Sequence, residues 1–471
     1  MRSPLRHRCP EGDGMGTQAP PSSHSGPTKN LAAFVSRLRW SNLPDDVQQA
    51  ALRHLIDTLG VISGGASTDL SQRVASLLPV SRSGVCVPGR PERFSALDAA
   101  YLGGISGHGL ELDDGFRDGS VHPGVAVVPA LISAAQERPV DGETFMAALV
   151  AGYETIATVA RAYHPKLRQR GFHPTSAVGP FGSAAAIARL LGFSLGRTEA
   201  ALGLSSSSAA GTFAFLGGGA DVKRLHAGHA AREGFWAATL AQADVVGPPN
   251  VLEVSDGFGQ SFAGLPGSAP FSKPPGQPFG LSDCYFKPYP CCRHLQPALE
   301  GVLAIRRDHA LDPQDVTEIQ VETYSIAAEH AKTGWDDFAS AQLSFPYVLL
   351  LGLRFGAVEL KHFAPEHLAD HTFHALKPLV RVRATEEMDA LYPAQRPARV
   401  TVKTVQGRHT RFFGEALGSR DLPLSDDRLA GKFIGLVSPL LGRGRAEGVL
   451  EALWQLPKAP EVGRLIADLA V

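Results

Sequence analysis

Apolar side chains recur at helical spacing along the first half of the chain, which predicts a succession of amphipathic helices. After Thr28, one face of a first helix is marked by Leu31, Phe34, Val35 and Leu38. A second helix is expected to open at Asp45 and Asp46, since acidic side chains favour the first turn, and to end near Gly64. Further helices are predicted at 95–110, 125–138, 142–163, 178–192, 197–210 and 228–243. Residues 28–267 are therefore predicted to form one large, mostly helical domain.

The pattern changes after a run dense in glycine and proline at 245–280, which is a boundary signal. Strands are predicted at 319–324 and 380–382, and a hairpin at 399–413, with helices at 294–308 and 341–355 between them. From Ser425 the chain is helical again. We therefore predict a mainly α fold, in which both chain ends build a large helical domain (28–267 and 416–471). A smaller α+β lid domain, 268–415, is inserted between them.

The composition adds limits to this picture. Residues 1–27 are polar and rich in glycine, proline and serine, which predicts a disordered tail. The net charge of −1 argues against nucleic-acid binding and against an anionic membrane surface. No apolar run reaches the roughly 18 residues of a membrane span. The five cysteines form no C-x-x-C pair, so the usual zinc and thioredoxin signatures are absent, and a reducing, cytoplasmic compartment is expected.

Two stretches in the first half gather ionisable residues around histidines. The first contains Glu111, Asp113 and Asp114 and is followed by His122; three carboxylates so close together are tolerated where they bind cations or polarise histidines. An acidic helix end beside a turn is the alternative. The second places His173 directly before a helix of small residues, where free backbone N–H groups suit an anion. A capping turn is the simpler interpretation of that stretch.

Two later stretches are basic. Glycines 217–219 lead into Lys223, Arg224 and His226, which could hold carboxylates or form a solvated basic turn. The other spans 286–294 and combines Lys287 with the residues Cys291, Cys292, Arg293 and His294. Adjacent cysteines do not readily share one metal ion, and an iron–sulfur cluster needs more cysteines than this stretch offers. The four stretches together favour metal-free acid/base chemistry on a carboxylate substrate.

These four stretches, in this order, resemble the MmgE/PrpD family, which includes 2-methylcitrate dehydratase, cis-aconitate decarboxylase and iminodisuccinate epimerase. The resemblance covers about residues 29–460. It rests on the segments 43–60, 107–124, 171–179, 223–228, 287–292, 341–347 and 399–413. It implies a helical domain with an α+β lid, an active site between them, a homodimer, and no metal or other cofactor.

The resemblance also implies site residues. The catalytic residues would be His122, His173, Lys223 and Asp114. The substrate-binding residues would be Glu111, Lys287, Arg293, His294, Cys292 and His226. Three positions depart from the usual family pattern, because Glu111 replaces an aspartate, Gly115 replaces a threonine, and the histidine nearest to Cys292 is His294, two residues later. These departures favour the dehydratase- and epimerase-like branches.

The sequence therefore predicts an enzyme that abstracts an α-proton from a small di- or tricarboxylic acid, most simply a dehydratase resembling 2-methylcitrate dehydratase. The alternatives are an epimerase or decarboxylase on a related acid, such as iminodisuccinate or cis-aconitate, and a non-catalytic homologue that binds a metabolite. The expected partners are a small polycarboxylate and a second copy of the chain, with no nucleic acid and no membrane.

Overall fold

The fold is taken from a computed structural model, which describes residues 26–218 and 221–471. The predicted disordered tail falls outside these residues except for its last two, and Pro27 already begins the first helix. The helices of the first half are α1 (Pro27–Arg37), α2 (Asp45–Gly65), α3 (Asp69–Ala75), α4 (Ala96–Gly109), α5 (Gly124–Ala135), α6 (Gly142–Tyr163), α7 (Lys166–Gln169), α8 (Pro174–Leu190), α9 (Leu195–Ser206) and α10 (Asp221–Gln242). Two short strand pairs accompany them, β1 (Val85–Cys86) with β2 (Arg93–Phe94) and β3 (Gly115–Phe116) with β4 (Cys284–Tyr285).

All the helices predicted in the first half are present, but two of them begin four or more residues earlier than the pattern indicates. The helix predicted at 178–192 is α8, which starts at Pro174, a residue preorganised for the first helical position. The helix predicted at 228–243 is α10, which starts at Asp221, whose carboxylate suits the first turn. Lys223, Arg224 and His226 therefore lie on a helix and not on the turn that the preceding glycines suggested.

Small residues allow the central helices to approach closely. Helices α4, α5 and α8 all pack against α10, and α4 meets α10 at Gly104 and Gly228. A Cβ atom on Gly104 would lie 2.7 Å from the backbone oxygen of Ala227, and one on Gly228 would lie 2.5 Å from that of Tyr101. This contact fixes the start of α10 beside the end of α4, where the ionisable residues are concentrated.

A second core lies in the α+β part of the chain. Its strands are β5 (Val316–Thr323), β6 (Val380–Ala384), β7 (Ala398–Thr404) and β8 (Gly407–Phe413), in the order β6-β5-β7-β8. Only the β5–β6 pair is parallel. Its helices are α11 (Gln296–Asp308), α12 (Ser325–Ala328), α13 (Phe338–Ala341), α14 (Phe345–Phe355), α15 (Pro365–Leu368), α16 (His371–Leu376) and α17 (Glu386–Leu391), of which α11 and α14 pack on the sheet.

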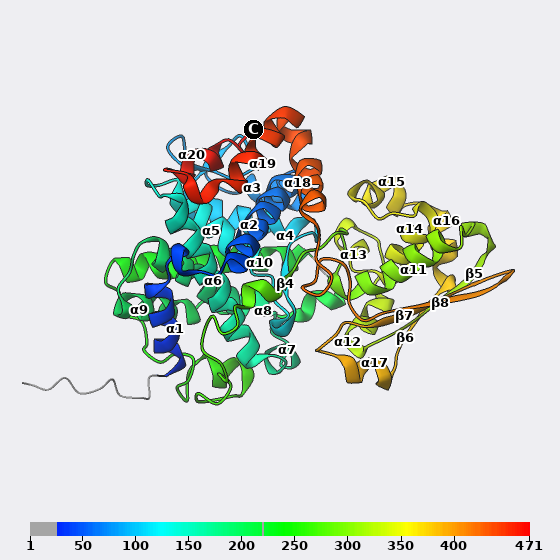
Figure 1. The fold of residues 1–471 in the computed structure, drawn as a ribbon, viewed down its shortest axis with the longest axis horizontal. Coiled ribbons are helices and arrows are strands. Elements are labelled where there is room, and N and C mark those ends of the chain that lie inside the picture. The colour runs from blue at the N-terminus through cyan, green and yellow to red at the C-terminus, as the bar shows by residue number, and fades with distance from the viewer. Residues whose placement is uncertain (1–25, 219–220) are drawn as a thin grey trace, which may run out of the picture.

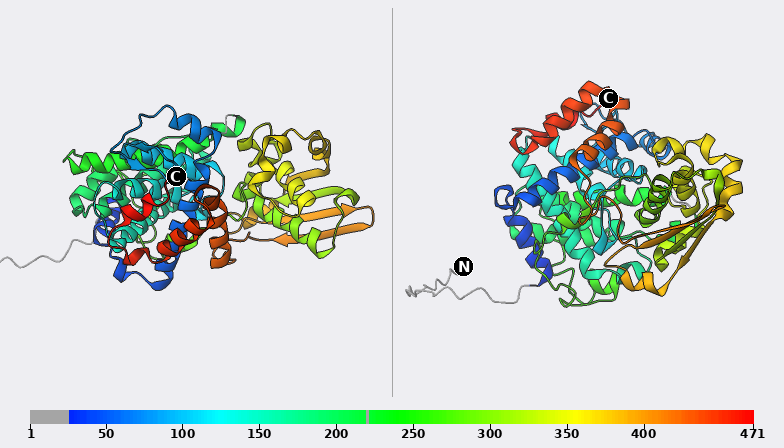
Figure 2. Two further views of the ribbon diagram at one scale, coloured as in Figure 1. Left: turned by 90° about the horizontal axis from the view of Figure 1, so that it is seen from above. Right: turned by 45° about the vertical axis from the view of Figure 1, so that its right-hand side comes forward.

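The chain end returns to the helical part. Helices α18 (Asp426–Leu441), α19 (Arg443–Trp454) and α20 (Val462–Ala467) share the helical core, and α18 packs along α2 (Figure 1). Residues 271–286 also pack on that core, and the second core begins at Cys291, so the change of core comes after the predicted boundary at 268. The two views in Figure 2 show the sheet and its helices beside the helical body.

The prediction of a mainly α fold is confirmed. Among the described residues, no helix combines the length and the apolar character needed to cross a membrane.

Candidate active site

A cavity of about 50 Å³ lies where the helical body meets the α+β unit. It exceeds the roughly 10–15 Å³ that one water molecule needs. Both parts of the fold contribute side chains to it. Eight of the ten predicted site residues line it: Glu111, His122, His173, Lys223, Lys287, Cys292, Arg293 and His294. Asp114 and His226 lie behind this lining, in contacts described below.

The pairing of β3 with β4 brings two of the predicted stretches together. Gly115 pairs with Tyr285 and Phe116 with Cys284 in an antiparallel register. A Cβ atom at Gly115 would lie 2.3 Å from the Tyr285 hydroxyl oxygen, so the larger threonine typical of the family would collide with Tyr285 here. This pairing places the acidic segment 111–114 beside Lys287.

Glu111 and Asp113 neutralise two lysines inside the site. Glu111 forms ion pairs with Lys223, from the first turn of α10, and with Lys287 at 3.1 Å. Lys287 also lies 3.1 Å from Oδ1 of Asp113. Glu111 has a φ of +52°, a left-handed conformation that is uncommon for a residue with a side chain and that typically marks functional sites.

These contacts set the charges of the four groups. Burial alone would raise the pKa of Glu111, but Lys223 and Lys287 hold it well below 4.5. Burial would likewise raise the pKa of Asp113, and His108 and Lys287 hold it well below 3.8. Burial opposes the charge on Lys287, yet Asp113 and Glu111 raise its pKa above 10.5. Burial lowers the pKa of Lys223, so Lys223 releases a proton more readily than Lys287 does.

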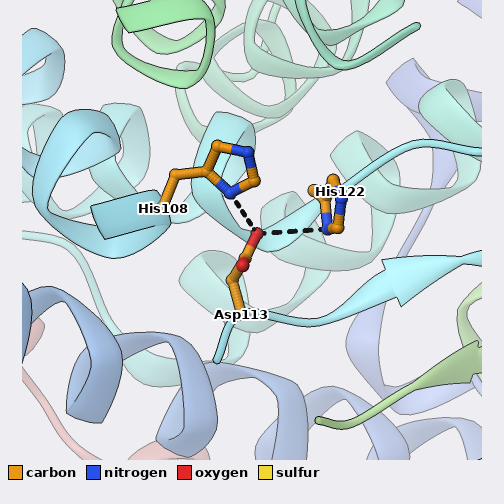
Figure 3. Close-up of side chains that lie close together, drawn as sticks. All are labelled: His108, Asp113 and His122. Carbon is orange, nitrogen blue, oxygen red and sulfur yellow. Dashed lines mark hydrogen bonds and ion pairs between the residues drawn. The ribbon is translucent and has the colours of Figure 1, made fainter. Parts of the chain in front are cut away.

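Asp113 also connects two histidines, as Figure 3 shows. Its Oδ2 atom lies 2.7 Å from Nδ1 of His108 and 3.1 Å from Nδ1 of His122. Two imidazoles and a carboxylate are a ligand set that divalent metals accept, and the three ligand atoms lie within 4.8 Å of one another. Here the two nitrogens face the carboxylate oxygen directly, and the Lys287 ammonium beside the same carboxylate would repel a cation. The cluster is thus built around the hydrogen bond between His108 and Asp113, with the Asp113 carboxylate also facing His122.

Asp114 stabilises the site from outside the cavity. Its carboxylate accepts hydrogen bonds from the Tyr153 hydroxyl at 2.7 Å and from the Gly124 backbone at 2.9 Å, and it lies 2.9 Å from Nδ1 of His54. Its backbone oxygen lies 2.6 Å from Nδ1 of His122. These contacts fix the turn that carries His122, so Asp114 is a positioning residue in this geometry.

His173 occupies the N-cap position of α8, and its side chain faces His226 of α10, with the two Nδ1 atoms 3.0 Å apart. Burial and the neighbouring His226 hold the pKa of His173 well below 6.5. Burial and His229 lower the pKa of His226 to about 4. Both rings are therefore neutral near pH 7. When Nδ1 of His173 donates to His226, its Nε2 atom keeps the lone pair of a base.

The α+β unit contributes a thiol–imidazole pair. The Cys292 Sγ atom lies 3.9 Å from Nε2 of His330, which lies on a short 3-10 helix, Glu329–Lys332. The other ring nitrogen of His330 lies 3.1 Å from the Leu343 backbone oxygen. Burial alone would raise the pKa of Cys292, but His330 and Lys223 lower it to about 6. The pair can therefore hold and release a proton near neutral pH.

Arg293 and His294 were both expected to contact a substrate carboxylate. The Arg293 guanidinium donates to the backbone oxygens of Leu417 and Ala416, each at 2.7 Å, and pairs with Glu415 at 3.3 Å. Its hydrogen-bonding capacity is thus largely used within the protein. His294 has a hydrogen bond to the Tyr324 hydroxyl, and burial followed by the charge of Arg396 holds its pKa well below 6.5.

Three further basic residues that line the cavity escaped the sequence analysis: Arg168, His330 and Arg396. Arg168 lies among other basic residues on α7, and Arg396 precedes an ordinary strand, β7. His330 has no neighbouring motif. Only the folded arrangement brings them to the site, so no local signal could have identified them.

Comparisons with known proteins agree with this architecture. The model of the MmgE/PrpD N-terminal domain matches residues 29–268, and that of the MmgE/PrpD C-terminal domain matches residues 289–456. A cis-aconitate decarboxylase of Mus musculus is 26% identical, over 94% of this chain and 94% of its own length. The cis-aconitate decarboxylase-like protein oryM of Aspergillus oryzae is 28% identical, over 93% and 96%. The cis-aconitate decarboxylase of Homo sapiens is 26% identical, over 91% of both.

These relatives are named as decarboxylases, and they support an enzyme of the lyase type. The two family models together span the helical body, the α+β unit and most of the returning helices. The chain belongs to the MmgE/PrpD family.

Proposed function

We propose that this chain is a lyase that generates a carbanion next to a carboxylate on a small di- or tricarboxylic acid. The observation that carries the proposal is that the buried imidazole of His173 and the ammonium group of Lys223 line the same cavity. A neutral imidazole can accept an α-proton, and an ammonium group stabilises the negative charge that develops on the adjacent carboxylate.

Each neighbouring group has a part in this chemistry. His226 orients the His173 ring, and the Asp113 carboxylate faces His122. Glu111 fixes the Lys223 ammonium at the start of α10. Cys292 and His330 hold a proton that can be delivered to a leaving group or to the carbanion. Removal of an α-proton followed by loss of hydroxide is a dehydration, whereas loss of carbon dioxide followed by protonation is a decarboxylation.

Decarboxylation of an unsaturated acid of the cis-aconitate kind is the first reaction to test. It is the activity named for relatives that align over more than nine tenths of the chain. Phe213, Phe215 and Leu343 also line the cavity. Apolar side chains disfavour a solvated carboxylate and so favour its loss as carbon dioxide.

Dehydration of an acid of the 2-methylcitrate kind is the second candidate. The Cys292–His330 pair favours it, because loss of hydroxide needs an acid to protonate the leaving oxygen, and this pair lies in the cavity with His173. The same proton would serve an epimerase when it returns to the opposite face of the carbanion.

Proton NMR in D₂O with a panel of acids tests the proposal directly. Purified protein is incubated separately with cis-aconitate, 2-methylcitrate, citrate and iminodisuccinate. A decarboxylated product, a dehydrated product or bare α-proton exchange would distinguish the three reactions. Binding of these acids without turnover would favour the non-catalytic alternative, and the absence of exchange or product with every acid would contradict the proposal.

We also propose that the enzyme works as a homodimer and without a metal, as the family resemblance implies. Light scattering should then give a mass about twice the 49.9 kDa of one chain. Treatment with a chelator should leave turnover of the active acid unchanged.

A further inference from the structure

Two groups of cations line the cavity, and they differ in how their charges are balanced. Lys223 and Lys287 lie in direct contact with the carboxylates of Glu111 and Asp113. These two lysines and two carboxylates sum to no net charge. Their principal electrostatic partners are therefore already supplied by the protein.

Arg396 has no such partner. It is 2% exposed, and its Nε and Nη1 atoms make no hydrogen bond to any described residue. Within the part of the chain that the structure describes, its guanidinium forms no ion pair, and its nearest recorded contact is with the Tyr285 ring, at 5.2 Å from the ring centroid. The guanidinium nevertheless lines the cavity.

Arg168 lies on the opposite side of the interface between the two parts of the fold, and its charge is also poorly balanced. Its guanidinium lies 4.0 Å from the centroid of the Phe213 ring and also lines the cavity. Its nearest recorded carboxylate is that of Glu329, at 3.9 Å, and this carboxylate is 62% exposed. The carboxylate that interacts with Arg396 through its charge, Glu415, is itself bound by Arg117 and Arg293.

The surroundings reinforce the excess of positive charge. Burial and the charges of Arg396 and Arg168 lower the pKa of His164 to about 4, so its imidazole is neutral. Neither ring nitrogen of His164 has a hydrogen-bond partner among the described residues, nor does the Tyr392 hydroxyl. A buried cation without a partner is costly, and an anionic ligand removes that cost.

We propose that Arg396 and Arg168 form a carboxylate-binding subsite that holds a second carboxylate of the substrate, away from the group that reacts beside His173 and Lys223. A planar carboxylate matches the two parallel N–H groups of a guanidinium. Arg168 belongs to the helical body and Arg396 to the α+β unit, so one carboxylate bound by both joins the two parts over the reacting centre. The subsite restricts the substrate class to acids with at least two carboxylates. This inference rests on the proposed function and deepens it.

Titration calorimetry with tricarballylate tests the subsite without turnover. Tricarballylate is a saturated tricarboxylate that has neither a double bond nor a hydroxyl group to react. The variants are Arg396→Gln and Arg168→Gln, with Arg307→Gln as the matched control, because the Arg307 side chain on α11 is 77% exposed. Each cavity variant should raise the Kd for tricarballylate by about tenfold to a hundredfold, which is the change in affinity expected when one charge-assisted hydrogen bond is lost. Arg307→Gln should leave the Kd unchanged, and Arg396→Lys should give an intermediate value.

The possible results separate the subsite from the proposed function. If wild-type protein binds tricarballylate and both Gln variants bind it within twofold of wild type, the subsite is wrong while the proposed function stands. If wild-type protein binds no polycarboxylate and turns none over, both are wrong. Circular dichroism verifies that each variant is folded, and if Arg396→Gln does not fold, Arg168→Gln decides, because that side chain is less buried.

Discussion

Among the single residues of the cavity, His173 has the clearest chemical assignment. Its ring is neutral because it is buried and surrounded by His226, His108 and Lys223, all of which oppose a further positive charge. A base of this kind stays unprotonated as the pH falls through 6.5, where an ordinary histidine would become protonated. It therefore remains able to accept an α-proton in mildly acidic solution.

We predict that His173→Ala lowers kcat by roughly 10²- to 10⁴-fold, the usual contribution of a general base. The acid limb of the wild-type pH–rate profile should show no step near pH 6.5 from this residue, because its pKa lies well below that value. Steady-state kinetics on the acid identified by NMR measures both effects. His309→Ala, at an exposed position after α11, should retain wild-type kcat. Near-normal turnover by His173→Ala would remove His173 from the mechanism.

The ionisation of the Cys292 thiol gives a second prediction that depends on pH. Its thiol should ionise near pH 6, because His330 and Lys223 outweigh the effect of burial. A free cysteine ionises near pH 8.5. The ultraviolet absorbance of the thiolate, taken as the difference between wild type and Cys292→Ser, should therefore rise as the pH increases through about 6. His330→Phe should move this midpoint upward.

Cys291 is the matched control for that titration. It is fully buried, and burial together with the neighbouring Cys292 raises its pKa. The difference between wild type and Cys291→Ser should thus show no thiolate near pH 6. A midpoint near 8.5 for Cys292 would contradict the proposed thiol–imidazole pair.

The extent to which these residues could be predicted depends on their local context. His122, His173, Lys223, Lys287 and Cys292 lie in dense polar stretches, and all of them line the cavity. Arg168, His330 and Arg396 lie outside these stretches, and they meet at one cavity only because the α+β unit folds against the helical body. Long-range packing of this kind leaves no periodic trace in one sequence.

At the scale of elements, the contact between α4 and α10 determines whether the site assembles. The first helix carries His108 at its end and leads into Glu111, and the second presents Lys223 from its first turn. Gly104 lets the two backbones approach, since a Cβ atom there would lie 2.7 Å from both the Ala227 oxygen and the Gly228 Cα. Backbone atoms in a packed helix cannot move aside as a flexible side chain can.

We predict that Gly104→Ala destabilises the protein by roughly 1–3 kcal/mol through overpacking and lowers kcat, since α10 must move away from Glu111. Gly448→Ala is the matched control on α19, where no atom lies within 4 Å of an added Cβ. At that exposed helical position alanine should stabilise the protein by about 0.5–1 kcal/mol. Thermal unfolding and steady-state kinetics measure both variants. A stable, fully active Gly104→Ala protein would show that the two helices do not fix the site.

The elements themselves were largely predictable, and their limits were less so. Helices α4, α6 and α9 begin and end within a few residues of the predicted ranges, and each opens on a serine or aspartate whose side chain caps the first turn. The β7–β8 hairpin lies at the predicted place, flanking the turn before Gly407. The glycines before α10 favour a turn and so indicate a later start, whereas tertiary packing against α4 and α8 extends the helix.

At the scale of the whole molecule, two chain crossings connect the helical body with the α+β unit. The outgoing segment passes through Phe286 and the returning one through Gly418, and the Phe286 backbone N–H donates to the Gly418 oxygen at 2.9 Å. The sequence pattern predicted that both chain ends build the helical body. It could not predict how closely the two crossings lie, because that contact joins residues more than a hundred positions apart.

Arg293 holds the two crossings together, and this gives the last prediction. Arg293 comes directly after the outgoing segment in the chain, and its guanidinium donates hydrogen bonds to the Leu417 and Ala416 backbone oxygens of the returning segment. Arg293→Met keeps much of the volume but leaves these two backbone oxygens without the guanidinium donor, and Glu415 keeps only its ion pair with Arg117. We expect a loss of roughly 3 kcal/mol in the free energy of unfolding. Scanning calorimetry should show this as a lower Tm, whereas Arg307→Met, at an exposed position on α11, should leave the Tm unchanged.

The same variant distinguishes a structural Arg293 from the substrate-binding residue that the sequence suggested. If Arg293 is structural, Arg293→Met lowers the Tm and affects KM only through the position of the α+β unit. Tricarballylate should then still raise the Tm of Arg293→Met, as it should for wild type, because Arg396 and Arg168 remain in place. A residue that holds the substrate would have the opposite effect. In that case Arg293→Met would keep the wild-type Tm in the absence of ligand and lose the stabilisation by tricarballylate, and the connecting role argued from Leu417 and Ala416 would be wrong.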